Sequence, residues 1–137
     1  MRDALLAAGA TPHVIATHKG AIRRRNDALV VDRSFHTASS AEADAVVVAG
    51  GAGLSTNPAV LTYVQSAHRH FKPLAAWGDG AELLTAAGIG LDDAGLVVAD
   101  RGTKTFAKAI VQALAVHRHW ERAAEHPTRR ALTETEA

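Results

Sequence analysis

Short apolar runs alternate with amphipathic stretches along most of this sequence. Residues 44–49 carry Ala and Val behind a single Asp, and two further apolar runs cover residues 74–77 and 95–99. Uninterrupted runs of this kind are typical of strands buried on both faces of a parallel sheet. The residues between them place apolar side chains three and four positions apart, which predicts helices that pack on that sheet. The alternation predicts an α/β fold.

Turn and capping residues mark where the predicted elements begin and end. Asn57 and Pro58 are typical of an N-cap and the first position of a helix. Asn26 and Asp27 lie between two short β-type runs and predict a small hairpin over residues 21–31. Helices are expected over residues 2–8, 58–71, 81–87 and 105–122.

The chain opens on a helix, where an α/β sheet would open on a strand. In a doubly wound sheet of flavodoxin-like order the first strand lies in the middle. Removing about five buried apolar residues would forfeit on the order of 7–15 kcal/mol, which equals the net stability of a typical domain, about 5–15 kcal/mol. We therefore expect a doubly wound, flavodoxin-like, mostly parallel sheet with helices on both faces and its first strand missing. Either the sequence is a fragment cut just after that strand, or another segment takes its place.

Length and charge limit the classes of function. The 137 residues suit one domain, and a net charge of +1 gives no field that favours nucleic acid or an anionic membrane. No apolar run approaches the roughly 20 residues that span a bilayer, and the N-terminus does not resemble a signal peptide. The expected location is the cytoplasm. We expect one domain over residues 1–123 and a disordered tail over residues 124–137.

The sequence contains no cysteine. Disulfides, thiolate catalysis and Cys-ligated zinc are therefore excluded. The absence matters most at residues 72–84, which predict a strand, a tight turn and a helix. This is the layout of a nucleophile elbow, in which the turn presents a Ser or Cys above the sheet. The residue at the turn is Gly78.

Several segments together resemble the ThiJ/PfpI group of the class I glutamine-amidotransferase-like superfamily. They are the Asp-Ala-Val-Val-Val-Ala-Gly-Gly run, the Pro-led helix, Lys72–Ala76 and the turn with its Glu-Leu-Leu helix. The closer similarity is to the C-terminal domain of large-subunit catalases, and its most specific cue is the His-Arg-His-Trp block at residues 117–120. The resemblance covers about residues 4–122.

The resemblance implies a site without its reactive groups. Active ThiJ/PfpI members carry Cys, His and Gly at the turn, where this chain has Gly78, Asp79 and Gly80. Their acidic partner comes from the end of the first strand, which is missing here. We expect no catalytic residue and a vestigial pocket in which Trp77 fills the space of a substrate and two glycines match the oxyanion donors. The expected pocket residues are Gly50, Gly51, Trp77, Gly78, Asp79 and Glu82.

The resemblance also implies a function. In large catalases this domain is an appended module of a tetramer, and hydrogen peroxide is degraded at a haem in a separate barrel. We therefore expect a non-catalytic domain that packs on and stabilises a parent catalase, without a cofactor of its own, since the only tyrosine, Tyr63, is a poor match for a haem ligand. The alternatives are a free-standing ThiJ/PfpI-like hydrolase or glyoxalase and a chaperone-like holdase, with flavin binding more distant.

Other patterns have simpler structural explanations. The pairs His68/His70 and His117/His119 are two apart on predicted helices, which turns their side chains about 200° from each other and disfavours a shared metal. The expected metal content is none.

The acidic and basic clusters are similarly weak signals. Asp79 and Glu82 could form a carboxylate pair, but at a helix start they are expected to favour the helix dipole. Asp79 would also repel a phosphate at the Gly-Asp-Gly turn. The arginines at residues 23–25 predict a solvated strand edge, with docking to a larger partner as the alternative.

Overall fold

A computed structural model describes residues 1–23, 25–50 and 53–123. Gly51 and the predicted tail of residues 124–137 lie outside these ranges. The centre of the fold is a three-stranded parallel sheet in the order β5-β6-β7. The strands are β5 (Val46–Val48), β6 (Leu74–Trp77) and β7 (Leu96–Ala99).

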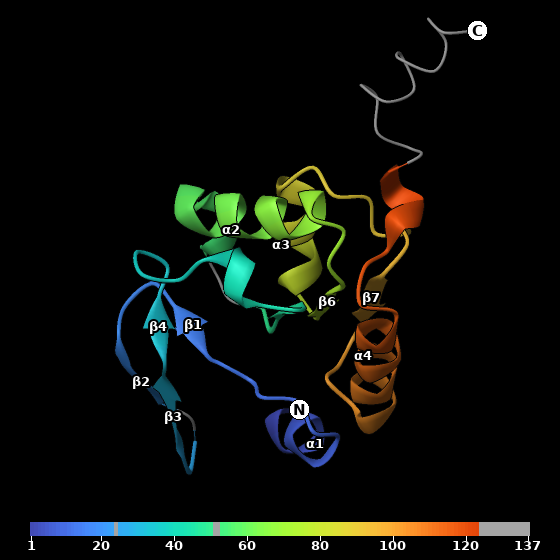
Figure 1. The fold of residues 1–137 in the computed structure, drawn as a ribbon. Coiled ribbons are helices and arrows are strands. Elements are labelled where there is room, and N and C mark those ends of the chain that lie inside the picture. Colours follow the sequence, from blue (N-terminus) through green and yellow to red (C-terminus); the bar gives the residue numbers. More distant parts are fainter. Residues whose placement is uncertain (24, 51–52, 124–137) are drawn as a thin grey trace, which may run out of the picture.

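Helices cover both faces of this sheet (Figure 1). The alternation of side chains along β6 explains why two separate cores form. Leu74 and Ala76 belong to a cluster with α2 and α3, whereas Ala75 packs with α1 and α4. The predicted α/β architecture with helices on both faces is confirmed. The helices are α1 (Arg2–Ala7), α2 (Pro58–Arg69), α3 (Gly80–Ala86) and α4 (Lys104–Val116).

Side-chain caps fix the starts of the two longest helices. The Asn57 side-chain oxygen accepts from the Ala59 N–H at 3.0 Å, and Pro58 occupies the first turn of α2. The Thr103 hydroxyl oxygen accepts from the Phe106 N–H at 3.2 Å at the start of α4. Each cap satisfies a backbone donor that has no partner inside the helix. No helix in the described ranges is long and apolar enough to cross a membrane.

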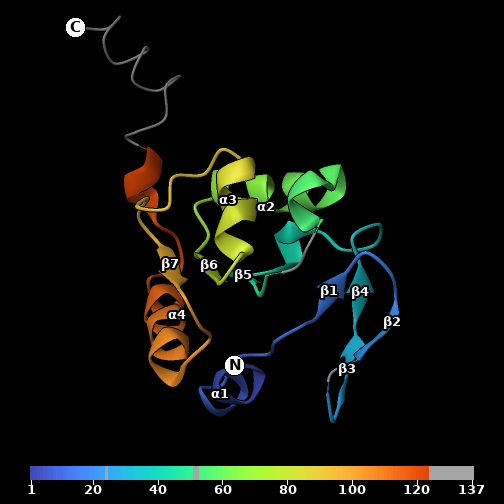
Figure 2. The same cartoon turned by 180° about the vertical axis from the view of Figure 1, so that it is seen from behind.

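Two further pairs of strands lie beside the main sheet. The predicted hairpin is confirmed as β2 (Gly20–Arg23) and β3 (Ala28–Val31), which pair antiparallel. Most of its side chains are exposed. The strands β1 (Ile15–Ala16) and β4 (Arg33–Ser34) flank it and pair parallel with each other. Figure 2 places β1 and β4 on the β5 side of the main sheet.

The prediction of one long last helix over residues 105–122 is wrong. α4 ends at Val116, and a separate 3₁₀ turn, η3 (Trp120–Ala123), follows. His117 breaks the helix because its φ of 69° lies in the left-handed region. The chain then turns back, and the His119 N–H donates to the Phe71 carbonyl at 2.7 Å. His117 and His119 therefore do not share a helix.

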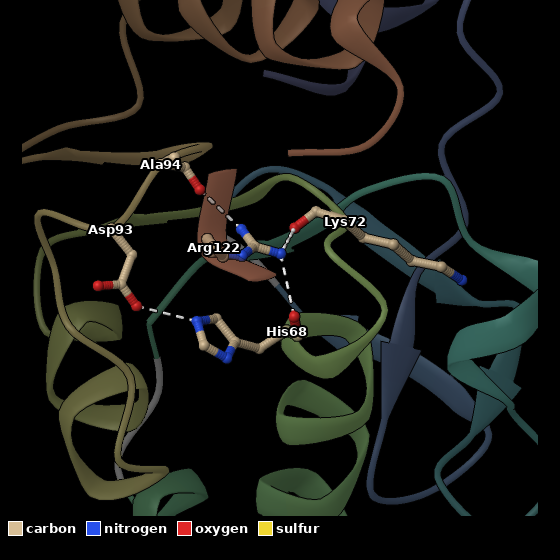
Figure 3. A network of polar contacts seen from close by, with 5 residues as sticks. All are labelled: His68, Lys72, Asp93, Ala94 and Arg122. Atoms are coloured by element: carbon tan, nitrogen blue, oxygen red, sulfur yellow. Dashed lines mark hydrogen bonds and ion pairs between the residues drawn. The ribbon is translucent and has the colours of Figure 1, made fainter. Parts of the chain in front are cut away.

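A buried arginine holds η3 against the body of the domain (Figure 3). Arg122 is only 5% exposed, and its side chain donates to three backbone carbonyls. Two of them, His68 and Lys72, lie at and just beyond the end of α2, at 3.0 and 2.9 Å. The third, Ala94, precedes β7 and lies at 2.8 Å. Arg122 thus ties the end of α2 to the loop before β7, and at the His68 carbonyl it is a second donor beside the Phe71 N–H.

Replacing this arginine should destabilise the domain. Arg122→Leu removes three hydrogen bonds of a buried side chain, so we expect the free energy of unfolding to fall by about 2–4 kcal/mol. Urea unfolding followed by circular dichroism measures the change. Arg69→Leu is the matched control because Arg69 is exposed near the same helix end. If Arg122→Leu and Arg69→Leu lowered the free energy of unfolding equally, the stabilising role of the Arg122 hydrogen bonds would be contradicted.

Lys72 is also buried, with 3% of its surface exposed. Its ammonium donates to the Ser40 carbonyl. Burial lowers the pKa of Lys72 below its ordinary value of 10.5, Arg118 lowers the pKa further, and Asp44 opposes both effects. The folded protein therefore holds this proton less tightly than the unfolded chain does.

This difference predicts a pH dependence of stability. As the pH rises through the folded pKa towards 10.5, the unfolded state binds more protons than the folded state. The free energy of unfolding of the natural protein should therefore increase relative to that of Lys72→Met. Urea unfolding of both proteins between pH 7 and pH 10 gives the two curves. A constant difference between them would refute the prediction.

Candidate functional site

The turn between β6 and α3 lies at the junction of the sheet and a helix. Gly78 follows the last residue of β6 directly, and its N–H donates to the Ala99 carbonyl of β7 at 3.0 Å. Its φ of 59° is left-handed, a conformation that costs other residues energy. Asp79 comes next as the N-cap residue of α3. Residue 78 therefore stands at a sharp strand-to-helix turn and is exposed to solvent.

The end of the neighbouring strand lies against this turn. Gly50 follows β5, and a Cβ at that position would collide with the Asp79 carboxylate. Parallel strands end at the same edge of a sheet, which explains why the two segments meet. The described chain therefore brings Gly50, Gly78 and Asp79 together. Gly51, which was predicted to supply an oxyanion donor together with Gly50, lies outside the described residues.

A small hollow opens beside the turn. It encloses about 290 Å³ including space open to solvent, and Asp79 and Glu82 line it together with Gly50, Leu54 and Ser55. Both carboxylates belong to exposed residues. Ser55 is the one hydroxyl-bearing side chain among the lining residues, and no His or Lys lines the hollow in the described part of the chain. The described lining therefore offers two carboxylates and one hydroxyl, without an imidazole or an amine.

Trp77 lies elsewhere. Its ring packs edge-on against Phe106 of α4, with ring centres 5.7 Å apart. The ring belongs to the core cluster on the α1 and α4 face of the sheet, and it does not line the hollow, whose Val48 and Leu83 belong to the opposite core cluster. Alternation along β6 is the reason, because residues 75 and 77 point to one face and residues 74 and 76 to the other. The structure therefore does not bring Trp77 together with the other predicted pocket residues.

Asp79 and Glu82 sit at the start of α3. Glu82 lies in the first turn, and Asp79 makes no side-chain hydrogen bond to the helix. Their negative charges are placed where the helix dipole favours them. The position is compatible with the structural role expected for these residues.

Three histidine side chains each contact a polar group of the protein. His68 Nε2 lies 2.9 Å from Asp93 Oδ2, and His70 Nδ1 lies 2.7 Å from the Ser66 carbonyl oxygen. His119 is buried, with its Nε2 3.2 Å from the Ala113 carbonyl oxygen. Across the residues with described positions, no three His, Cys, Asp or Glu side chains gather as a metal site would require.

The buried cations Lys72 and Arg122 were not identified by the sequence patterns. Lys72 lies between Phe71 and Pro73 at the start of a buried strand, and that apolar setting is the one local signal of its burial. Arg122 has Ala residues after it and charged or aromatic residues before it, which predicts an exposed side chain. Its partners lie 28–54 positions away, so no local pattern could reveal them.

Known proteins resemble this chain over most of its length. The sequence profile of the C-terminal domain found in long catalases matches residues 1–124. Catalase-2 of Bacillus subtilis (strain 168) is 31% identical over 123 residues, and Catalase HPII of Mycobacterium avium is 40% identical over 111 residues. The aligned parts cover 88% and 69% of this chain but 18% and 16% of these relatives. The chain thus spans less than a fifth of their length.

A solved structure supports the fold. A two-domain protein of Anabaena variabilis, containing DJ-1/ThiJ/PfpI-like and ferritin-like domains, superposes with a TM-score of 0.72 at 22% identity. The superposition covers 82% of this chain and 42% of that protein. The shared fold is ThiJ/PfpI-like, as the sequence resemblance implied. On the profile match over residues 1–124, the chain belongs to the family of C-terminal domains found in long catalases.

Proposed function

We propose that this chain serves as the non-catalytic C-terminal domain of a large catalase, where it packs on the parent enzyme and stabilises it. Family membership supports the proposal. The observation that carries it is Gly78, which occupies the strand-to-helix turn at which ThiJ/PfpI-like enzymes place a nucleophile. The pocket residues Gly50, Gly51, Gly78, Asp79 and Glu82 are then remnants of an ancestral site. Peroxide degradation belongs to the haem of the parent enzyme.

Tyr63, the one tyrosine of this chain, does not fit the role of a haem ligand. A tyrosinate is one of the axial ligands that haem proteins use. Tyr63 is 8% exposed and packs edge-on against Phe35, with ring centres 5.7 Å apart. Burial raises the pKa of the Tyr63 phenol, and the charge of Glu42 raises it further, so the ionised form is disfavoured. The proposal therefore assigns no haem chemistry to this chain.

Exposed apolar side chains supply surfaces for packing. Val30 of the β2–β3 hairpin is 67% exposed, and Ile22 on the partner strand is 44% exposed. Trp120 of η3 is 64% exposed and packs against Phe71, with ring centres 5.0 Å apart and ring planes tilted by 50°. Large apolar groups in solvent favour contact with another protein surface. The proposed partners are the catalase barrel and neighbouring subunits of a cytoplasmic tetramer.

The proposal predicts the size of the natural polypeptide. An antibody against residues 1–123 should capture, from the source cells, a polypeptide several times heavier than 14.3 kDa that carries haem absorbance and degrades peroxide. Denaturing gels, the visible spectrum and peroxide consumption measure the three properties. Proteolytic removal of this domain should make the captured enzyme lose activity faster on heating. Capture of only a 14.3 kDa, haem-free polypeptide would refute the proposal.

A thiol introduced at residue 78 should not give the chain catalytic activity. Gly78→Cys should lower the free energy of unfolding by about 1–2 kcal/mol because of its left-handed backbone, and methylglyoxal turnover should stay at background. Gly88→Cys is the matched control away from the turn, since Gly88 has a φ of 79° and no atom lies within 4 Å of the position that a Cβ would take. The two variants should unfold at similar urea concentrations. Turnover by Gly78→Cys alone would favour a free-standing enzyme instead.

A further inference from the structure

The Asp93 carboxylate lies between a histidine and an arginine at the end of α2. Its Oδ2 is 2.9 Å from His68 Nε2, and both side chains are about one-quarter exposed, at 24% and 26%. An ionised carboxylate only accepts hydrogen bonds, so the His68 Nε2–H is the donor. Arg122 of η3 belongs to the same group of side chains (Figure 3). Burial lowers the pKa of Arg122, whereas the charges of Asp93 and Glu121 raise it.

One donor of the Arg122 side chain has no acceptor. Nη1 and Nη2 donate to three backbone carbonyls, but Nε is buried and bonds to nothing. Over residues 1–23, 25–50 and 53–123 it is the one buried side-chain nitrogen or oxygen without a hydrogen bond. A buried donor on a charged group is costly to leave unpaired. Arg122 therefore lacks an acceptor, while a carboxylate near it bonds to His68.

The Asp93 side chain can change partner without a change in the backbone. The Asp93 N–H donates to the Gly90 carbonyl at 3.2 Å, and the next residue, Ala94, accepts from Arg122 Nη1 at 2.8 Å. Gly90 leaves room for the carboxylate, because a Cβ there would lie 2.6 Å from Asp93 Oδ1. In the described part of the chain, His68 is the one hydrogen-bond partner of this side chain. Rotation about its side-chain bonds therefore breaks a single contact.

We propose that Asp93 is a proton-controlled switch, which bonds to His68 while the imidazole is protonated and turns to Arg122 Nε when the imidazole is neutral. Imidazoles ordinarily change charge between about pH 5 and 8, and a guanidinium stays charged throughout that range. A hydrogen bond between two ions is about twice as strong as one with a neutral donor. Protonated His68 therefore competes for the carboxylate, whereas neutral His68 leaves Arg122 as the stronger donor.

The exchange acts on η3 because Arg122 belongs to that turn. The Arg122 bonds to backbone carbonyls, and the bond from the His119 N–H to the Phe71 carbonyl, hold η3 in both states. A bond from Arg122 Nε to Asp93 adds one contact in the neutral state alone. The seating of η3 should thus loosen in weak acid and tighten as the pH rises. This inference concerns the domain itself and does not depend on the proposed function.

Other charged groups near His68 are exposed. Asp92 precedes Asp93 in the loop, Glu121 precedes Arg122 on η3, and Arg69 and His70 follow His68 at the end of α2. All four are exposed to solvent. Water and salt screen the interactions of such charges. They bias the switch weakly compared with the partly buried Asp93.

Two buried groups stand closer. The Lys72 ammonium donates to the Ser40 carbonyl. The His119 ring packs against Gly95, where a Cβ would lie 2.4 Å from the ring, and its Nε2 is 3.2 Å from the Ala113 carbonyl oxygen. His119 is a second imidazole beside η3, so a test must separate its protonation from that of His68.

The remaining elements that contact α2 bring two carboxylates. Glu82 is the one titratable residue of α3 and lies in its first turn, whereas the last turn of α3 meets α2, where Gln65 donates to the Ala87 carbonyl at 3.1 Å. Glu42, on the 3₁₀ turn η1 (Ser40–Glu42), is 3.5 Å from Arg33. Neither carboxylate is a hydrogen-bond partner of His68.

Nuclear magnetic resonance of the 137-residue chain between about pH 5 and 8 tests the exchange directly. The Arg122 Nε–H signal and the Asp93 carboxyl carbon signal should shift with the same midpoint as the His68 ring. In His68→Gln both signals should stay constant, because glutamine gains no proton. His70→Gln is the matched control, since His70 is an exposed imidazole two residues away, and it should keep the response.

Hydrogen exchange measures the seating of η3. The His119 amide reports its opening, because it bonds to the Phe71 carbonyl at 2.7 Å. After correction for the intrinsic rate, its protection should be on the order of tenfold greater at pH 8 than at pH 5. The amide of Ala76, which is 0% exposed in the central strand, gives the reference for global opening. Asp93→Asn should remove this difference, since an amide forms no ion pair.

Three results would overturn the proposal. One is an Arg122 Nε–H signal that stays constant while the His68 ring titrates. Another is a response that persists in His68→Gln, which would assign it to His119. The third is equal protection of the His119 amide at both ends of the pH range. If His68→Gln fails to fold, Asp93→Asn decides, because it should abolish the Arg122 response while the His68 ring still titrates.

Discussion

Backbone hydrogen bonding is the constraint on which this structure depends. A buried N–H or carbonyl without a partner costs about as much as several good contacts provide. Parallel pairing satisfies β6 on both sides, because it lies between β5 and β7. Arg122 satisfies carbonyls at the end of α2 and before β7.

The same constraint explains why charged residues occur in the interior. Lys72 and Arg122 can be buried because backbone carbonyls accept hydrogen bonds from their charged groups. Burial disfavours their charged forms, which lowers both pKa values. The result is a domain in which polar contacts across the molecule hold η3, while its two cores consist mainly of aliphatic side chains.

The strand-to-helix turn has the layout of a nucleophile elbow, with a glycine at its bend. The left-handed backbone at Gly78 and the close approach of Gly50 to Asp79 give the turn its shape. Nucleophilic catalysis needs a nucleophile and a group that activates it. The described lining of the hollow supplies two exposed carboxylates and one serine hydroxyl, and no thiol or imidazole. A stabilising role in a larger enzyme needs the fold and does not need this site.

Local patterns were sufficient wherever the cause of a structure is local. Asn57 and Pro58 predicted the start of α2, and Asn26 and Asp27 predicted the hairpin, because capping and turn preferences act over a few residues. The valines of β5 predicted a buried strand. The glycine at residue 78 predicted a turn without a nucleophile, since the side chain is simply absent there.

Contacts between distant residues decided the rest. The last helix ends at Val116 because His119 and Arg122 bond to carbonyls some 50 positions away. The spacing of apolar residues along the helix carries no information about such distant partners. The Trp77 side chain packs against α4 because β6 turns residues 75 and 77 to that face of the sheet. Which face these residues take depends on strands and helices elsewhere in the chain. The sequence by itself determined which segments become strands, helices and turns. Only the tertiary structure decided which face each side chain takes and which backbone groups remain unpaired, because both depend on what lies beside a segment in space.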